Sequence, residues 1–149
     1  MPADSELALP HTWRPLGPRI MGAVLLVGLF AVSAVAWFSL KADVKAKFSG
    51  SEKGTLLFFA LLVVVLVHAL TRSRVEVRAD GMTVVNGYRR RDFDWAQVVA
   101  VHMPSGAPWV TLDLADGSTC AAMGIQASDG GRARAAVRQL RALVASHGG

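Results

Sequence analysis

The chain has 149 residues but only one cysteine, Cys120, so no internal disulfide can form and nothing indicates an oxidising compartment. Common catalytic motifs are also missing: the sequence contains no G-x-S-x-G, H-E-x-x-H, C-x-x-C or phosphate-loop glycine pattern. The histidines lie far apart, without the spacing of metal ligands, at His11, His68, His102 and His147. We therefore expect a protein that is not an enzyme and has no catalytic residues, no metal site and no cofactor.

Charged residues are absent from two long apolar stretches, residues 20–40 and 54–70. The hydrocarbon core of a bilayer is about 30 Å thick and needs roughly 20 helical residues to cross it, so the first stretch is long enough and the second lies near the lower limit. Lys53 and Arg72 flank the second stretch, and their long side chains can reach outward to the headgroups. The sequence thus predicts a transmembrane helical hairpin over residues 20–70 in a multi-pass protein of the cell inner (plasma) membrane.

A cleaved signal peptide is the alternative interpretation of the first stretch. Arg14 and Arg19 would form its charged beginning, and residues 34–36 (Ala-Val-Ala) its small-residue cleavage site. Against cleavage, the apolar run continues through Trp37 and Phe38 to a length that spans a bilayer. We favour a membrane span, and in the alternative the second stretch would still anchor the product.

The segments beside the two stretches carry weaker signals. Residues 1–19 contain four prolines and no apolar periodicity, which predicts an irregular N-terminal tail. A hairpin places both ends of the chain on one side of the membrane and the linker on the other. Five arginines, two before the first stretch and three soon after the second, compare with four lysines in the linker, so charge alone does not decide the orientation. His68 lies four residues before Arg72 and is interpreted as a neutral residue at headgroup level, with a proton-relay group as the alternative.

Beyond Arg72 the apolar residues alternate with polar ones, which is the period of a half-buried strand. Tight-turn signals at Asp80-Gly81, Asn86-Gly87 and Asp116-Gly117 separate the segments. The pattern predicts about six short antiparallel strands, over residues 74–78, 82–85, 88–93, 98–103, 109–115 and 118–123. Cys120 falls in the last of them and is expected to be a small buried residue.

A helix is predicted over residues 132–146, where no proline or interior glycine occurs. Asp129 is expected to act as its N-cap or as an acid in its first turn. Its apolar stripe, expected to cover the sheet, consists of Ala133, Val137, Leu140 and Val144. We therefore expect residues 71–149 to form one small domain with an antiparallel sheet and a C-terminal helix.

The order of these segments, with VRADGMTVVNGYRRRDFDWAQVVAV at residues 77–101, resembles the bacterial PH-like domain family of small actinobacterial membrane proteins. The matching features are an Asp-Gly hairpin that opens a DGMTVVNG strand, an Arg-rich strand, an acidic-Trp turn at Asp94-Trp95 and an LADG strand end at residues 114–117. Two preceding spans are also usual in that family. The resemblance implies two transmembrane helices followed by an α+β PH-like domain over residues 71–149, in which a bent antiparallel sheet is capped by the C-terminal helix. It also implies that the domain is cytoplasmic and performs no chemistry.

The strongest candidate binding feature is the run Arg89, Arg90 and Arg91. Arginine recognises phosphate through two parallel hydrogen bonds, and a domain tethered to a membrane stays close to anionic headgroups. The alternative is a solvated strand face whose charge prevents the aggregation of a sheet edge. Asp92 and Asp94 favour that alternative, because they neutralise part of the run.

A second basic stripe consists of Arg134, Arg138 and Arg141, a pattern also typical of the solvent side of an amphipathic helix. Trp109 is a candidate anchor for a partner, although Trp109 and Trp95 are both expected to pack into the sheet core. Nucleic-acid binding is disfavoured, because no aromatic residues alternate with the arginines to stack bases.

Together these features predict a non-enzymatic membrane protein that presents a cytoplasmic PH-like interaction module to a protein partner or to its own copies. The surfaces expected to take part are Arg89–Arg91 and the loop over residues 104–108. One alternative is the binding of anionic lipid headgroups through the same arginines. Another is an accessory subunit of a larger membrane complex, with the spans as the recognition element.

Overall fold

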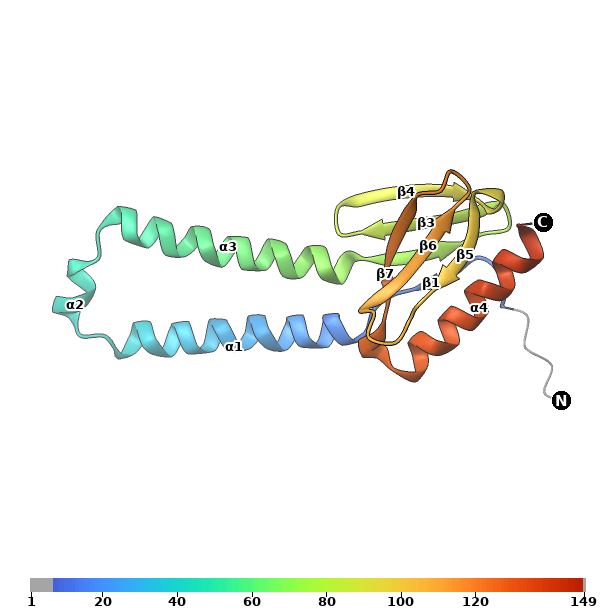
Figure 1. Cartoon of the computed structure of the whole chain (residues 1–149). Helices are drawn as coiled ribbons and strands as arrows, with labels where there is room; N and C mark the ends of the chain where they lie inside the picture. The colour runs from blue at the N-terminus through green and yellow to red at the C-terminus, as the bar shows by residue number, and fades with distance from the viewer. Residues whose placement is uncertain (1–6, 149) are drawn as a thin grey trace.

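Two long apolar helices extend side by side from a β-rich domain in the computed structural model, which describes residues 7–148 (Figure 1). Helix α1 (Gly17–Ser39) leads away from the domain, the short helix α2 (Ala42–Lys47) lies at the distant turn, and α3 (Gly50–Arg72) returns. The most apolar windows of α1 and α3 have mean hydropathies of 2.3 and 2.4, and only 6% of each window is buried. Both helices are therefore long and apolar enough to cross a membrane, and neither is a core helix of the domain.

Helix α3 begins four residues earlier than the predicted span because a capping box starts it. The Ser49 hydroxyl accepts a hydrogen bond from the Glu52 N–H, and the Glu52 carboxylate accepts one from the Ser49 N–H at 2.8 Å. These bonds satisfy two backbone donors that would otherwise be free at the first turn. The apolar stretch alone does not reveal this start of the helix, because the capping residues are polar.

Over the described residues the domain contains seven antiparallel strands in two sheets, with a C-terminal helix packed against them (Figure 1). The first sheet has the order β1-β2-β3-β4 and the second the order β5-β6-β7. The strands are β1 (His11–Trp13), β2 (Arg74–Val77), β3 (Gly81–Asn86), β4 (Arg89–Asp94), β5 (Val98–His102), β6 (Trp109–Leu114) and β7 (Thr119–Gln126), and the helix is α4 (Gly131–His147). Short 3-10 helices, η1 (Trp95–Gln97) and η2 (Ala127–Asp129), follow β4 and β7. The predicted antiparallel sheet with a C-terminal helix is confirmed.

The inward-facing apolar side chains of the strands and the apolar stripe of α4 pack into one core between the two sheets and the helix. Val75 and Val77 of β2 are fully buried, as are Val110 and Leu112 of β6. The buried residues of α4 are Ala133, Ala136, Val137, Leu140 and Val144, which include the whole predicted stripe. Cys120 is also buried, as predicted.

Trp95 fills the core at the start of η1 and is 5% exposed. Its indole Nε1–H donates to the backbone oxygens of Arg78 and Ala79, at 3.1 and 3.2 Å. A buried indole that finds such partners contributes its large apolar area without leaving an unpaired donor. The expectation that Trp95 packs into the core is confirmed.

Strand β1 lies within the segment predicted to be an irregular tail. His11 is opposite Val77 and Trp13 is opposite Val75, so β1 extends the first sheet beyond β2. The two helices are therefore inserted between two neighbouring strands of one sheet, and the domain includes residues on both sides of them. Residues 1–6, also part of the predicted tail, lie outside the described residues. A product cleaved near residue 36 would lack β1.

Asp129 does not cap α4 as the sequence predicted. It ends η2, and the residue at the N-cap of α4 is Gly130, with no side-chain cap. Its carboxylate instead accepts hydrogen bonds from the N–H groups of Leu16 and Gly17, at 3.0 and 2.7 Å. Asp129 thus caps α1, because the fold brings η2 against the first turn of that helix.

Candidate functional site

The domain has two ends that differ in their surroundings. We call the end from which α1 and α3 leave the helix side, and the opposite end the far end (Figure 1). Since β2 starts immediately after α3 and the strands alternate in direction, the β3–β4 turn lies on the helix side. The turns at Asp80-Gly81 and Asp116-Gly117 lie at the far end.

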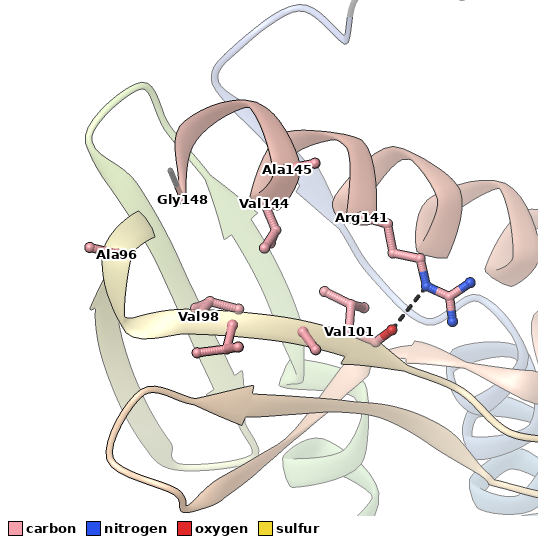
Figure 2. A pocket seen from close by; sticks show the side chains of 9 residues that line it. Ala96, Val98, Val101, Arg141, Val144, Ala145 and Gly148 are labelled. Carbon is pink, nitrogen blue, oxygen red and sulfur yellow. Dashed lines mark hydrogen bonds between the residues drawn. The ribbon is translucent and has the colours of Figure 1, made fainter.

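A groove of about 470 Å³ runs between β5 and the last turns of α4 (Figure 2). Apart from Arg141 at one end, the residues that line it are apolar: Ala96, Val98, Val99, Ala100, Val101, Val144, Ala145 and Gly148. Strand β5 is an edge of its sheet, because β6 is its single strand neighbour. Among the strand residues that the structure describes, Val99 is the one large hydrophobic residue that is exposed, at 61%.

Arg141 joins the two sides of this groove. Its Nε–H donates to the backbone oxygen of Val101 at 2.9 Å, which fixes the guanidinium beside β5 (Figure 2). Arg138 and Arg134 lie about one and two turns earlier, respectively, on the same side of α4, and both are exposed. The predicted stripe therefore reaches the groove at Arg141, while Arg134 and Arg138 lie on earlier turns of α4, outside its lining.

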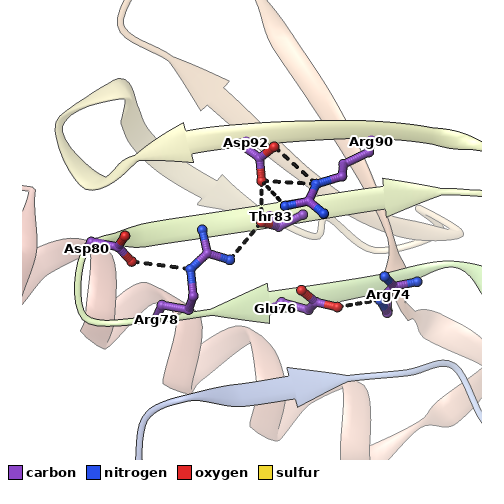
Figure 3. Close-up of polar contacts among 7 residues, drawn as sticks. All are labelled: Arg74, Glu76, Arg78, Asp80, Thr83, Arg90 and Asp92. Carbon is purple, nitrogen blue, oxygen red and sulfur yellow. Dashed lines mark hydrogen bonds and ion pairs between the residues drawn. The ribbon is translucent and has the colours of Figure 1, made fainter.

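The run Arg89–Arg91 is divided between the two faces of β4, because successive side chains of a strand point in opposite directions. Arg90 lies on the outer face of the first sheet and pairs with Asp92 at 3.0 Å (Figure 3). The hydrogen bonds from Arg90 and from the Thr83 hydroxyl hold the pKa of Asp92 below its usual range. The outer face continues with the pairs Arg74–Glu76 and Arg78–Asp80 (Figure 3).

Arg91 lies on the opposite face, with its guanidinium carbon 5.1 Å from the centre of the Phe93 ring. It lines a second cavity, of about 410 Å³, between β4 and β6, together with Asp92, Asp116 and Leu114. The carboxylate of Asp116 beside Arg91 reduces the attraction of this cavity for an anion. The hydroxyl and N–H of Ser118 bond Asp116 and lower the pKa of that carboxyl.

Arg89 is the member of the run on the helix side, next to Tyr88 in the β3–β4 turn. The Tyr88 hydroxyl lies 2.8 Å from Nδ1 of His68, and the Arg72 guanidinium carbon lies 5.7 Å from the centre of the Tyr88 ring. The Gly87 N–H donates to the Ser73 hydroxyl at 3.0 Å. Tyr88, which the sequence did not single out, thus joins the sheet to the end of α3, although β2 and β3 separate it from that helix in the sequence.

Trp109 begins β6 and is half-buried, so it does not join the buried core as the sequence predicted, and it does not line the β5–α4 groove either. The loop over residues 104–108 before it is tied to η2 by the Ala127 N–H, which donates to the Pro108 oxygen at 2.9 Å. His102 and Asp113 form a cross-strand pair at 2.6 Å on β5 and β6. Over residues 7–148, no group of three or more histidines, cysteines and acids lies close enough to hold a metal ion.

Comparisons with known proteins agree with this architecture. A family model described as Bacterial PH domain matches residues 72–143. The uncharacterized proteins Rv1417 of Mycobacterium tuberculosis H37Rv and Mb1452 of Mycobacterium bovis are each 31% identical over 146 residues, which cover 98% of this chain and 93% of theirs. No solved structure matches the chain significantly. The chain thus belongs to the bacterial PH domain family.

Proposed function

We propose that this chain is a non-enzymatic, membrane-anchored PH-like module whose β5–α4 groove binds an extended apolar segment of a partner protein. The observation that carries the proposal is the combination of a strand edge that pairs with no other described strand and an apolar wall. Val99 is exposed on that edge, and the surface of α4 opposite it presents Val144 and Ala145.

Strand addition is the recognition mode that such a groove supports. A peptide that lies alongside an edge strand gains main-chain hydrogen bonds, and pockets for alternate side chains supply specificity. The groove is about 470 Å³ and lined mainly by valine and alanine, which suits small or medium aliphatic side chains. Exposed aliphatic side chains on an edge strand otherwise promote aggregation, so a bound partner also explains why Val99 faces outward.

The positive charge of the α4 arginines indicates which flanking residues the partner segment carries. Arg141 lies at one end of the groove, with Arg138 and Arg134 on the preceding turns of α4, and none of the three forms an ion pair among the described residues. Charge complementarity favours a partner whose apolar segment is flanked by Asp or Glu, since opposite potentials steer association and fix the register.

The proposed setting is the inner membrane, with α1 and α3 as spans and the domain in the cytoplasm. Their largely exposed apolar surfaces support membrane insertion, because such surfaces are costly in water. The arginines on the helix side support a cytoplasmic domain, since the cytoplasmic leaflet carries anionic lipids.

The test begins with a photo-crosslinking residue at position 99 of the full-length protein in its native membrane. A matched control carries the same residue at Ser118, which is exposed in the β6–β7 turn at the far end. We expect one protein partner to crosslink through Val99 and not through Ser118, with mass spectrometry identifying the crosslinked segment. Crosslinks between copies of this chain would instead indicate self-association, and labelling of lipid alone would contradict a protein-binding groove.

A synthetic peptide of the crosslinked segment then provides a direct measurement. Val99→Asp introduces a charge into the apolar wall, and we expect it to weaken binding by at least about 10-fold, because a buried unpaired carboxylate costs more than 1.4 kcal/mol. Ala79→Asp adds the same charge at an exposed residue of the β2–β3 turn and serves as the control. Equal affinities for the two variants would overturn the proposal.

A second candidate, an accessory subunit that is recognised through its spans, rests on how little α1 and α3 touch. Gly22 and Val67 are their buried residues, and a side-chain carbon on Gly22 would lie 2.7 Å from Cγ1 of Val67. The remaining helix surfaces are free to pack against other membrane helices. Replacing residues 24–65 by unrelated apolar helices while keeping this contact should abolish function under this candidate and preserve it under the groove proposal.

A further inference from the structure

We propose that the helix side of the domain is a binding site for the phosphate groups of anionic lipids, formed by Arg19, Arg72, Arg89 and Arg132. The inference requires the membrane span of the proposed function but is independent of the β5–α4 groove. It assigns Arg89 to lipid contact and leaves Arg90 and Arg91 outside the site.

The β3–β4 turn is held at the level where α3 would leave the hydrocarbon. The Gly87 N–H donates to Ser73, immediately after the last residue of α3, and the Tyr88 hydroxyl lies 2.8 Å from His68. His68 is four residues before Arg72, which is about 6 Å along the helix axis. Tyr88, 58% exposed, therefore lies at the depth of the interface, where the apolar ring and the polar hydroxyl of tyrosine are both accommodated.

The start of α4 is held at the same level by a separate contact. Asp129 bonds the first turn of α1, and Arg132 follows it in the first turn of α4 with an exposed side chain. Between the helices, Nε of Arg19 donates to the backbone oxygen of Thr71 at 3.3 Å. These contacts fix three separate parts of the chain around the ends of the two spans.

The ion pairs distinguish these arginines from those on the outer sheet face. Arg74, Arg78 and Arg90 each have a carboxylate partner. Arg19, Arg72, Arg89 and Arg132 have none among residues 7–148, and the carboxylate of Asp129, three residues before Arg132, is occupied by the backbone of α1. The turns at the far end carry acids instead, at Asp80 and Asp116.

Such an arrangement matches a layer of lipid phosphates. Guanidinium groups bind phosphate oxygens through paired, charge-assisted hydrogen bonds, and the spans keep the lipids within reach without a separate association step. Each basic residue near an anionic surface contributes a factor of roughly 5 in binding. Anionic lipids would thereby hold the domain upright on its spans, with the far end and the groove turned toward the aqueous phase.

The test measures backbone amide exchange of the full-length protein in nanodiscs of phosphatidylcholine alone and with added phosphatidylglycerol. We expect the anionic lipid to slow exchange by about 5-fold in residues 87–90 and 131–134. Exchange of the β6 core amides should stay constant, which separates local contact from a general change in stability. High salt should remove the effect, because interactions between exposed charges are screened.

Two double variants, each of which removes two positive charges, complete the experiment. Arg89→Gln with Arg132→Gln should abolish the slowing, whereas Arg78→Gln with Arg90→Gln removes two arginines from the outer face and should retain it. Core amide exchange in both variants reports whether the domain has folded. Three results would overturn the proposal. The anionic lipid could fail to slow exchange in the wild type, it could slow exchange only in the linker over residues 41–53, or the slowing could persist in the first double variant.

Discussion

The carboxylate of Asp129 accepts a hydrogen bond of 2.7 Å from the backbone N–H of Gly17, a residue 112 positions earlier in the chain. A second bond, from Leu16 at 3.0 Å, occupies the other oxygen. The contact places a negative charge at the N-terminus of α1, where the helix dipole and free N–H groups favour it. It therefore joins the last turn before α4 to the first turn of α1.

Replacing Asp129 by Asn should destabilise the protein by about 1 kcal/mol, because the charge and one of the two acceptors are lost. The measurement is thermal unfolding of the full-length protein in detergent, followed by circular dichroism. Asp43→Asn removes an exposed acid from α2 and is the matched control. Equal shifts of the midpoint in the two variants would show that the cap contributes nothing.

The described domain should fold without its helices only if β1 is retained. A chain that joins residues 7–16 to residues 73–148 through a short linker keeps the β1–β2 pairing, since Trp13 lies opposite Val75. Residues 73–148 alone leave the edge of β2 uncovered, and exposed edges promote association. We expect the joined chain to be monomeric and cooperatively folded in size-exclusion chromatography and thermal unfolding, and the shorter one to associate. A shorter fragment of equal stability would contradict a structural role for β1.

Gly124 should not tolerate a side chain. A Cβ at this position of β7 would lie 2.4 Å from the backbone carbon of Arg74 and 2.5 Å from its Cα. Backbone atoms cannot move aside as a flexible side chain can, so we expect Gly124→Ala to cost at least ~2 kcal/mol in the free energy of unfolding. Gly131→Ala, where no atom lies within 4 Å, should change stability by less than about 1 kcal/mol. Chemical denaturation of the joined chain compares the two.

Cys120 should resist thiol reagents in the folded protein. Burial raises the pKa of its thiol, with a smaller opposing effect from Arg91, so little thiolate is present at neutral pH. We expect slow labelling by a maleimide under native conditions and rapid labelling after denaturation. Raising the pH toward the ordinary thiol pKa should accelerate native labelling less than labelling of the unfolded chain. Fast native labelling would show that β7 opens locally.

Much of the fold could be predicted because its signals are local. The alternation at Val75 and Val77, the Asp-Gly and Asn-Gly turns and the α4 stripe each lie within one element. Strand β1 escaped prediction because it has three residues, lies among prolines and is defined only by its pairing with β2. The division into two sheets also depends on contacts between strands, which no single segment encodes.

The candidate sites were partly foreseeable. Successive side chains of a strand point to opposite faces, so the predicted strand already places Arg90 on the face opposite Arg89 and Arg91. In the structure, Arg90 pairs with Asp92 on that face. The β5–α4 groove and the contact between His68 and Tyr88 could not be foreseen, because each joins elements that are distant in sequence.

The sequence by itself determined two long apolar helices, an alternating β-rich segment and a final amphipathic helix, because hydrophobic composition and periodicity record which surface of each element avoids water. Tertiary structure alone decided that the helices are inserted between β1 and β2, that Asp129 caps α1 rather than α4, and that Arg89 lies at the helix side. These relations arise from hydrogen bonds and packing between residues far apart in the chain. Their geometry exists only after the two sheets and α4 have closed around one core.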